Sequence, residues 1–330
     1  MMMSSSRELE ETEYHSKDFN WEELSNDIEN DPKFSYHLLP FHRSSQSQSQ
    51  FQSSSSLDFQ SWNHFHARHS TGKFFKERRY LFKEFPELAS CVKYTKLLEI
   101  GCGNGSTVLP ILRYKENILV YACDCSTEAL ERTTEVIYAS NVVSPKTRFR
   151  PFCWDFSTSR IPQWLICDSC HQTSPQKQNL LLLGPSELDD NGISLPDITS
   201  SKESECCIGG MDFVTLIFTL SAVPVDRMSA AVVECFSVLK PGGLLFFRDY
   251  GLYDMTMLRF EADQRVGFRE YKRSDDTRSY FFSLDTARDL FLGTGFIQVE
   301  LEYCCVKSVN RRKEKTMRRV WVHGKFQKPM

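Results

Sequence analysis

The sequence predicts an α/β fold built on a mostly parallel, seven-stranded sheet that ends in an antiparallel hairpin. Two observations predict it. From about residue 95 to residue 248, apolar runs of strand length alternate with longer stretches whose apolar positions have helical spacing. This order of strand, helix and strand produces a parallel sheet with right-handed crossovers. The chain then ends in two strand-like runs around a basic turn, which predicts the hairpin.

Five strands and three connecting helices are expected in the parallel part. The strands are predicted at residues 97–100, 118–122, 148–153, 211–220 and 244–248, and the helices at 107–114, 127–138 and 227–239. Gly293 and Gly295 end the pattern of a further helix. That helix is predicted at 284–292, and the hairpin strands at 296–306 and 318–326.

The first 59 residues differ in composition from the rest. Residues 1–43 form an acidic leader, and residues 44–59 are rich in Ser and Gln. Because such a tract has little to bury, we expect a flexible linker that detaches the leader from the globular part of the chain. Apolar residues such as Trp21, Leu24 and Ile28 still predict a short leader helix, docked on a partner or on the core.

Residues 161–210 interrupt the alternation between the third and fourth strands. They are rich in Ser, Pro, Asp and Gln, so we predict a surface insertion. The insertion carries four cysteines: Cys167, Cys170, Cys206 and Cys207. Four cysteines can hold zinc, but the second pair is adjacent rather than spaced by two residues, so we predict no metal and keep zinc as the minor alternative.

Composition also limits the compartment. The chain has 330 residues, 41% of them hydrophobic, and 12 scattered cysteines, which favours a large core and reduced thiols. Its longest apolar run, 211–223, is shorter than the roughly 20 residues of a membrane-spanning helix. The acidic start resembles neither a secretory leader nor a transit peptide. We expect a cytoplasmic protein with no membrane partner, and the nucleus as the second compartment.

The sharpest motif is Gly101-Cys102-Gly103-Asn104-Gly105, which joins the first strand to the first helix. Alternate glycines let the backbone turn tightly and let a ligand approach main-chain atoms closely. The spacing differs from the G-x-G-x-x-G of dinucleotide phosphate loops, which disfavours an NAD-dependent oxidoreductase. It suits a ligand without phosphate, such as S-adenosylmethionine.

Two acids follow at the ends of the next two strands. Asp124 ends the second strand, where a carboxylate can accept hydrogen bonds from ribose hydroxyls. Asp155 follows the third strand, where it can meet an adenine amino group while Phe156 flanks the ring. With the tight turn at 240–243, this order resembles a Rossmann-like class I S-adenosylmethionine-dependent methyltransferase, from about residue 95 to the end.

A narrower resemblance rests on further stretches. They are Ser61 to His66, Phe74 to Tyr80, Leu216 to Val223, Arg248-Asp249-Tyr250-Gly251, Leu258-Arg259-Phe260 and Thr277 to Phe282. Together they are similar to the tRNA N3-cytidine methyltransferase family over about residues 60–327, apart from the insertion. The resemblance implies methylation of the cytidine at the 5′ edge of the anticodon loop, position 32, with S-adenosylmethionine as the donor.

The resemblance also implies a cofactor site. Residues 60–94 would form a segment that caps the cofactor and contacts RNA, before a methyltransferase domain at 95–330. In the cap, Trp62 would cover the cofactor, and His66 stands where the family usually has a tyrosine. The other implied contacts are Gly101 and Gly103 with the methionine part, Asp124 with the ribose, Asp155 and Phe156 with the adenine, and Ile217 beneath the sulfonium.

The chemistry suggests where the reacting base lies. Cytidine N3 is unprotonated at neutral pH, so no strong general base is needed, but the methylated base becomes cationic. A nearby carboxylate would stabilise that charge. We expect Asp249 to supply it, and Arg248 and Tyr250 to hydrogen-bond or stack on the base. The alternative is that Asp249 and Arg248 only brace the end of the strand.

Basic residues interleaved with aromatics indicate an RNA-binding surface. The expected contacts are Lys73, Lys76, Arg78, Arg79, Arg259, Arg273, Arg278, Arg311 and Arg312. A solvated surface would explain the same charges. The resemblance implies tRNAs with serine, threonine or arginine acceptors, and an aminoacyl-tRNA synthetase as a helper.

Two other functions stay open at this point. One is a methyltransferase of the same fold that acts on another RNA, a protein or a small molecule. The other is a non-catalytic RNA-binding partner that keeps the fold without turnover. The glycine loop with both acids disfavours the second.

Overall fold

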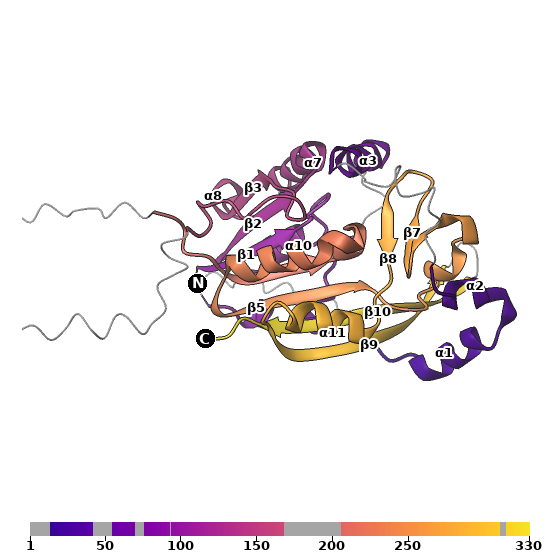
Figure 1. Ribbon diagram of the computed structural model, residues 1–330. Coiled ribbons are helices and arrows are strands. Elements are labelled where there is room, and N and C mark those ends of the chain that lie inside the picture. Colours follow the sequence, from indigo (N-terminus) through magenta and orange to yellow (C-terminus); the bar gives the residue numbers. More distant parts are fainter. Residues whose placement is uncertain (1–13, 42–54, 70–75, 93, 168–205, 311–314) are drawn as a thin grey trace, which may run out of the picture.

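The computed structural model describes residues 14–41, 55–69, 76–92, 94–167, 206–310 and 315–330. At its centre is a seven-stranded sheet in the order β3-β2-β1-β4-β5-β10-β9 (Figure 1). Strands β1 to β5 run parallel, and β10 pairs antiparallel with β5 and β9. The predicted fold class is therefore confirmed. The strands are β1 Thr95–Ile100, β2 Ile118–Asp124, β3 Phe149–Cys153, β4 Met211–Ile217, β5 Leu239–Tyr250, β9 Ile297–Asn310 and β10 Lys315–Gln327.

Helices bury both faces of this sheet, as parallel strands require. Side chains alternate along each strand, so Leu98 and Leu245 pack toward α10 and α11, while Leu97 and Phe246 pack toward α6 and α7. In the described part of the chain, none of the helices has both the length and the apolarity to cross a bilayer. The α-helices are α1 Trp21–Glu29, α2 Ser35–Leu38, α3 Ser55–Arg68, α4 Leu81–Glu84, α5 Glu87–Ser90, α6 Val108–Tyr114, α7 Thr127–Tyr138, α8 Pro145–Arg148, α10 Val225–Val238 and α11 Leu284–Leu292.

The described part of the leader, residues 14–41, packs on the rest of the fold, and α1 lies against the closing hairpin, although the sequence predicted that the leader is detached. Leu24 and Ile28 of α1 are buried in a core shared with Tyr271 and with Val320 of β10. Trp21 stacks on Tyr303 of β9 at a ring separation of 4.6 Å. Of the two dockings that the sequence left open for this helix, the structure has the one on the core.

The chain differs from the predicted elements at several points. Strand β5 begins at Leu239 rather than at residue 244, so it includes the residues of the turn predicted at 240–243. Strand β4 ends at Ile217 rather than at residue 220, because Phe218 has a positive φ of 56° and a 3-10 turn follows at Leu220–Ala222. Helix α3 begins at Ser55, inside the predicted linker. A small sheet of β6 Arg265–Gly267, β7 Glu270–Lys272 and β8 Arg278–Tyr280 escaped prediction, since its strands have three residues each. Most of the predicted insertion, 168–205, lies outside the described residues.

Candidate functional site

A cavity of about 690 Å³ lies at the carboxyl ends of the parallel strands. Gly101, Asp124 and Ile217 border it from the ends of β1, β2 and β4. Open α/β sheets bind ligands at this edge, where the strand order reverses, as it does here between β1 and β4. Eight residues predicted to bind the cofactor line the cavity: Trp62, His66, Gly101, Gly103, Asp124, Asp155, Phe156 and Ile217.

The glycine loop and Asp124 form one wall of the cavity. Gly101 and Gly103 have positive φ values of 67° and 52°, which favour glycine. The backbone N–H of Gly103 donates to Asp124 Oδ2 at 2.9 Å, and that of Ser126 donates to Oδ1 at 2.9 Å. An ionised carboxylate has further acceptor positions, so Asp124 can still accept from two ribose hydroxyls. The loop and the acid therefore hold each other in place.

Asp155 and Phe156 border the cavity after β3. Asp155 Oδ1 accepts hydrogen bonds from the backbone N–H and the hydroxyl of Ser157, at 3.0 and 2.7 Å. These bonds fix a carboxylate next to the buried Phe156 and Trp154 rings. An adenine fits such a place, because its amino group can donate to the acid while its ring packs on an aromatic side chain.

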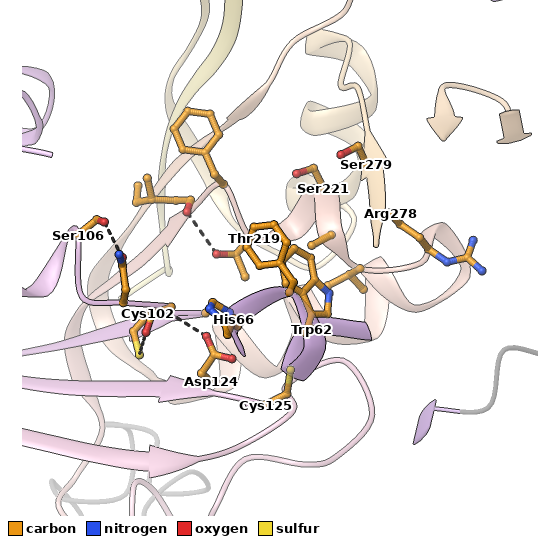
Figure 2. A pocket seen from close by; sticks show the side chains of 18 of the residues that line it. Trp62, His66, Cys102, Ser106, Asp124, Cys125, Thr219, Ser221, Arg278 and Ser279 are labelled. Carbon is orange, nitrogen blue, oxygen red and sulfur yellow. Dashed lines mark hydrogen bonds between the residues drawn. The ribbon is translucent and has the colours of Figure 1, made fainter. Parts of the chain in front are cut away.

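Trp62 and His66 project from α3 into the cavity (Figure 2). Helix α3 lies beside α7 (Figure 1), and His66 lies over the glycine loop, since a Cβ added to Gly103 would be 3.6 Å from His66 Cε1. Burial lowers the pKa of His66, and the Asp124 carboxylate opposes this shift. A neutral ring next to the loop can stack on a ligand or hydrogen-bond to it.

Arg78 was predicted to bind RNA, but its guanidinium lies in the wall of this cavity. It donates to Thr107 Oγ1 at 2.9 Å and to the carbonyl of Ile217 at 3.4 Å. Thr107 directly precedes α6, so the cation sits where the first helix after the glycine loop begins. The Arg78 guanidinium and the amino-terminal end of α6 both favour negative charge at this end of the cavity, so the carboxylate of a ligand can bind there.

Arg248 does not line the cavity, contrary to the predicted contact with the base. Its side chain is 1% exposed and pairs with Glu84. The guanidinium lies over the rings of Tyr80 and Trp321, at 4.8 and 4.5 Å. The structure therefore corrects its role to one of support behind the wall.

Asp249 likewise does not border the cavity and is fully buried. Its Oδ2 accepts from the backbone N–H of Ser221 at 2.9 Å, and its Oδ1 from that of Tyr250 at 2.8 Å. Burial raises its pKa to about 6. The predicted contact with the base is corrected accordingly: Asp249 holds the turn after β4, which agrees with the alternative that it braces the strand end.

Tyr250, the third predicted catalytic residue, does line the cavity. Its ring lies 5.3 Å from that of Phe218 and 5.7 Å from that of Phe281. In the sheet, Tyr250 is paired with Trp321 of β10, which lines the cavity too. This half of the cavity therefore offers flat aromatic surfaces.

Sequence reasoning missed several residues that line the cavity, among them Phe218, Thr219, Arg319 and Trp321. Phe218 and Thr219 fall in a range predicted as strand. Arg319 and Trp321 are two positions apart on β10, which pairs with β5, so their side chains point to the same face of the sheet. This spacing in the sequence was the signal that could have identified them. Arg319 is held by Asp254, with Nε 2.8 Å from Oδ2.

The other predicted RNA contacts fall into three groups. Three line the cavity: Lys76, Arg273 and Arg278. Two lie on the surface, where Arg79 pairs with Glu77 at 3.1 Å and Arg259 contacts Met255 Sδ at 3.6 Å. Three lie outside the described residues: Lys73, Arg311 and Arg312.

Glu99 lies under the glycine loop and is completely buried. It accepts a hydrogen bond from Thr215 Oγ1. Burial raises its pKa from 4.5 to about 7, and the bond from Thr215 and the charge of Arg78 oppose the shift. Between pH 4.5 and about 7, Glu99 is therefore protonated in the folded protein and ionised in the unfolded chain.

We predict a loss of stability as the pH rises from 4.5 to about 7, when Glu99 ionises in the fold. When the pKa of a carboxyl group is higher in the folded protein than in the unfolded chain, its contribution to stability is fully present at a pH below the unfolded pKa. This contribution is lost as the pH rises to the folded pKa. Over this window the wild type should lose about 3 kcal/mol relative to Glu99→Gln. Urea unfolding of both proteins across this range measures the difference. Parallel curves would contradict the prediction.

Comparison with known proteins gives concordant results. A family model described as a methyltransferase domain matches residues 58–301. The tRNA N(3)-cytidine methyltransferase METTL6 of Homo sapiens is 35% identical over 272 residues, which cover 81% of this chain and 79% of that protein. The tRNA N(3)-methylcytidine methyltransferase Mettl2 of Drosophila melanogaster is 30% identical, over 82% of this chain and 71% of that protein.

Solved structures match as well. A Burkholderia thailandensis 1,6-didemethyltoxoflavin-N1-methyltransferase with bound S-adenosylhomocysteine covers 88% of this chain and 94% of its own, at a TM-score of 0.49 and 12% identity. The two relatives match most of the chain, and the family model spans the glycine loop, Asp124 and the strand end at Tyr250. The chain therefore belongs to the tRNA N3-cytidine methyltransferase family, within the class I S-adenosylmethionine-dependent methyltransferases.

Proposed function

We propose that this protein methylates N3 of cytidine 32 in the anticodon loop of a subset of tRNAs. S-adenosylmethionine supplies an activated methyl group when bound. The observation that carries the proposal is that one cavity joins the glycine loop and its acids to an aromatic and cationic part lined by Tyr250, Trp321 and Arg319. A cofactor half and a nucleotide half thus share one space.

The chain's own groups divide between the two halves. Asp124 and Asp155 accept from the ribose and adenine of the cofactor, and Arg78 meets its carboxylate. Tyr250 and Trp321 offer rings on which a pyrimidine can stack. Because N3 lies on the Watson–Crick edge, the base must come from a single-stranded loop or be flipped. Asp249 does not touch the base but positions the cavity wall beside it, because it accepts a hydrogen bond from the backbone N–H of Ser221.

Several cations of the cavity suit the RNA backbone. Lys76, Arg273 and Arg319 line the cavity, and none of them is needed for a cofactor without phosphate. These cations favour an RNA substrate over the alternative of an uncharged small molecule. We further propose that serine, threonine or arginine tRNAs are the substrates, that an aminoacyl-tRNA synthetase helps to select them, and that the reaction takes place in the cytoplasm.

The test is methylation of purified tRNAs by the recombinant protein, followed by mass spectrometry of the nucleosides. N3-methylcytidine should form in wild-type transcripts and be lost when cytidine 32 is replaced by uridine. Methylation that persists in the replaced transcript would place the target elsewhere. Adding the synthetases one at a time identifies a helper by the increase in product.

We expect Asp124→Ala to weaken S-adenosylmethionine binding by at least roughly 100-fold, because two charge-assisted hydrogen bonds of about 1.5–3 kcal/mol each are lost. Loss of the bond from the Gly103 N–H also releases the loop. Isothermal titration calorimetry measures the affinity. The matched control is Asp289→Ala, which removes an exposed acid from α11. Equal affinities of the two variants would remove Asp124 from the ribose site.

A further inference from the structure

Three cysteines come together where the predicted insertion leaves and rejoins the fold. The sulfur atoms of Cys167, Cys206 and Cys207 all lie within 4.8 Å of one another. The Sγ atoms of Cys167 and Cys206 are 3.4 Å apart. Tetrahedral zinc with Zn–S bonds of about 2.3 Å places its sulfur ligands roughly 3.8 Å from one another. The three sulfurs therefore need only small movements to surround one ion.

The backbone holds these cysteines opposite each other. The N–H of Ile208 donates to the carbonyl of Trp164 at 2.9 Å, and the N–H of Gly210 donates to that of Leu165 at 2.9 Å. These two bonds join the segment before Cys167 to the segment after Cys207. The proximity of the thiols thus follows from main-chain pairing and does not depend on side-chain rotamers alone.

A backbone donor also supports a thiolate at this place. The N–H of Gly209 lies 3.4 Å from Cys207 Sγ and donates to it, and Gly209 has a positive φ of 73° that lets the chain turn back on the sulfur. Hydrogen bonds to a charged acceptor are stronger than those to a neutral one. Such bonds to the ligand atom are a common feature around metal-bound groups.

We propose that Cys167, Cys206 and Cys207 bind one Zn²⁺ ion through their thiolates. Each thiol releases its proton to the solvent as its Zn–S bond forms, so the site fills more readily as the pH rises. Three thiolates occupy three of the four positions of a tetrahedral ion. Cys206 is exposed and its two neighbours in the cluster are half-buried, so the ion has access from solvent.

The zinc has a structural role. Cys207 lies four residues before β4 begins at Met211, at the amino end of the strand, whereas the cofactor cavity lies at the carboxyl ends. The ion therefore cannot reach the reacting base. It ties the two ends of the insertion together and fixes the start of β4.

Metal analysis of the full-length protein tests this proposal. We expect about one zinc per chain in the wild type, and loss of most of it in Cys206→Ser and in Cys207→Ser. Cys153→Ser, which removes an exposed cysteine outside the cluster, should keep it. Cobalt in place of zinc should give the sulfur-to-metal charge-transfer absorption of thiolate ligands in the wild type and in Cys153→Ser, and this absorption should be lost in Cys206→Ser and in Cys207→Ser. Titration with S-adenosylmethionine checks that each variant is folded, and its affinity should not change.

A chelator supplies the second readout. It should lower the thermal midpoint of the wild type and leave that of Cys207→Ser unchanged, since this variant has no zinc to lose. Three results would overturn the proposal: a wild type that takes up no zinc in competition with a chelating dye, a Cys153→Ser variant that loses as much zinc as Cys207→Ser, or a Cys167–Cys206 disulfide in digests of protein purified without reductant.

Discussion

Replacing Gly101 by alanine is expected to abolish S-adenosylmethionine binding, with a loss of more than about 100-fold in affinity. A Cβ at this position would lie 2.3 Å from Thr219 Cγ2 and 2.7 Å from Thr219 Oγ1. The threonine cannot turn away freely, because its hydroxyl donates to the carbonyl of Ile100 at 3.1 Å. The backbone φ of 67° adds strain for any L side chain. The loop must therefore move away from the cofactor.

Two further variants separate the steric clash with Thr219 from the backbone strain of a positive φ. Gly295→Ala places a side chain at a positive φ far from the site, with Phe236 at an ordinary 3.7 Å, so it should leave the affinity unchanged. Gly101→Ala combined with Thr219→Ala removes both close contacts and should recover part of the binding. Calorimetry measures all three proteins. If Gly101→Ala binds as well as Gly295→Ala, the loop is not in contact with the cofactor.

The cofactor half of the site could be predicted from the sequence because it is built from local motifs. Gly101, Asp124 and Asp155 each stand at the end of an apolar run, and the carboxyl ends of parallel strands meet at one edge. Knowing the strand order was enough to place all three around one ligand. No contact between distant side chains had to be known.

The base-binding half could not be predicted in the same way. Adjacent residues of a strand point to opposite faces, so Arg248, Asp249 and Tyr250 cannot all face one ligand. Which of them does so depends on packing partners far away in the sequence. Arg248 pairs with Glu84, which lies 164 positions earlier in the sequence, and Asp249 accepts a hydrogen bond from the backbone N–H of Ser221.

The position of the leader was hidden for a similar reason. Composition correctly marks Trp21 and Leu24 as apolar, but it cannot say which surface receives them. The receiving surface forms only when Tyr303 on β9 and Leu252 after β5 come together, and Trp21 Nε1 donates to the carbonyl of Leu252 at 3.2 Å. A Ser- and Gln-rich tract between two segments of the sequence therefore does not show that the two segments lie apart in the fold.

The largest effect on stability is expected from Glu84→Ala. Glu84 is buried and pairs with Arg248, whose other contacts are the faces of Tyr80 and Trp321 and the hydroxyl of Tyr14 at 3.2 Å. Burial lowers the pKa of Arg248, but the Glu84 carboxylate, together with the smaller effects of Tyr80, Tyr14 and Cys304, outweighs burial and raises the pKa, so the guanidinium stays charged. Removing Glu84 leaves this cation unpaired inside the protein, which costs about 3–5 kcal/mol.

His323 adds to this cost. Its Nδ1 lies 3.1 Å from Glu84 Oε1, and its Nε2 lies 2.9 Å from Glu300 Oε2. Burial lowers the pKa of His323, but its hydrogen bonds to the two carboxylates outweigh burial and raise the pKa. One alanine substitution thus removes a buried partner from both Arg248 and His323.

Urea unfolding followed by circular dichroism measures the loss, with Glu77→Ala as the matched control. Glu77 pairs with Arg79 and Arg113 on the surface, and such exposed pairs contribute about 0–1 kcal/mol. Glu84→Ala combined with Arg248→Met removes the stranded charge as well, so it should be more stable than Glu84→Ala alone. Two results would contradict the prediction: Glu84→Ala that unfolds at the same urea concentration as Glu77→Ala, or a double variant that is less stable than Glu84→Ala alone. Either result would mean that the buried Arg248 cation does not depend on Glu84.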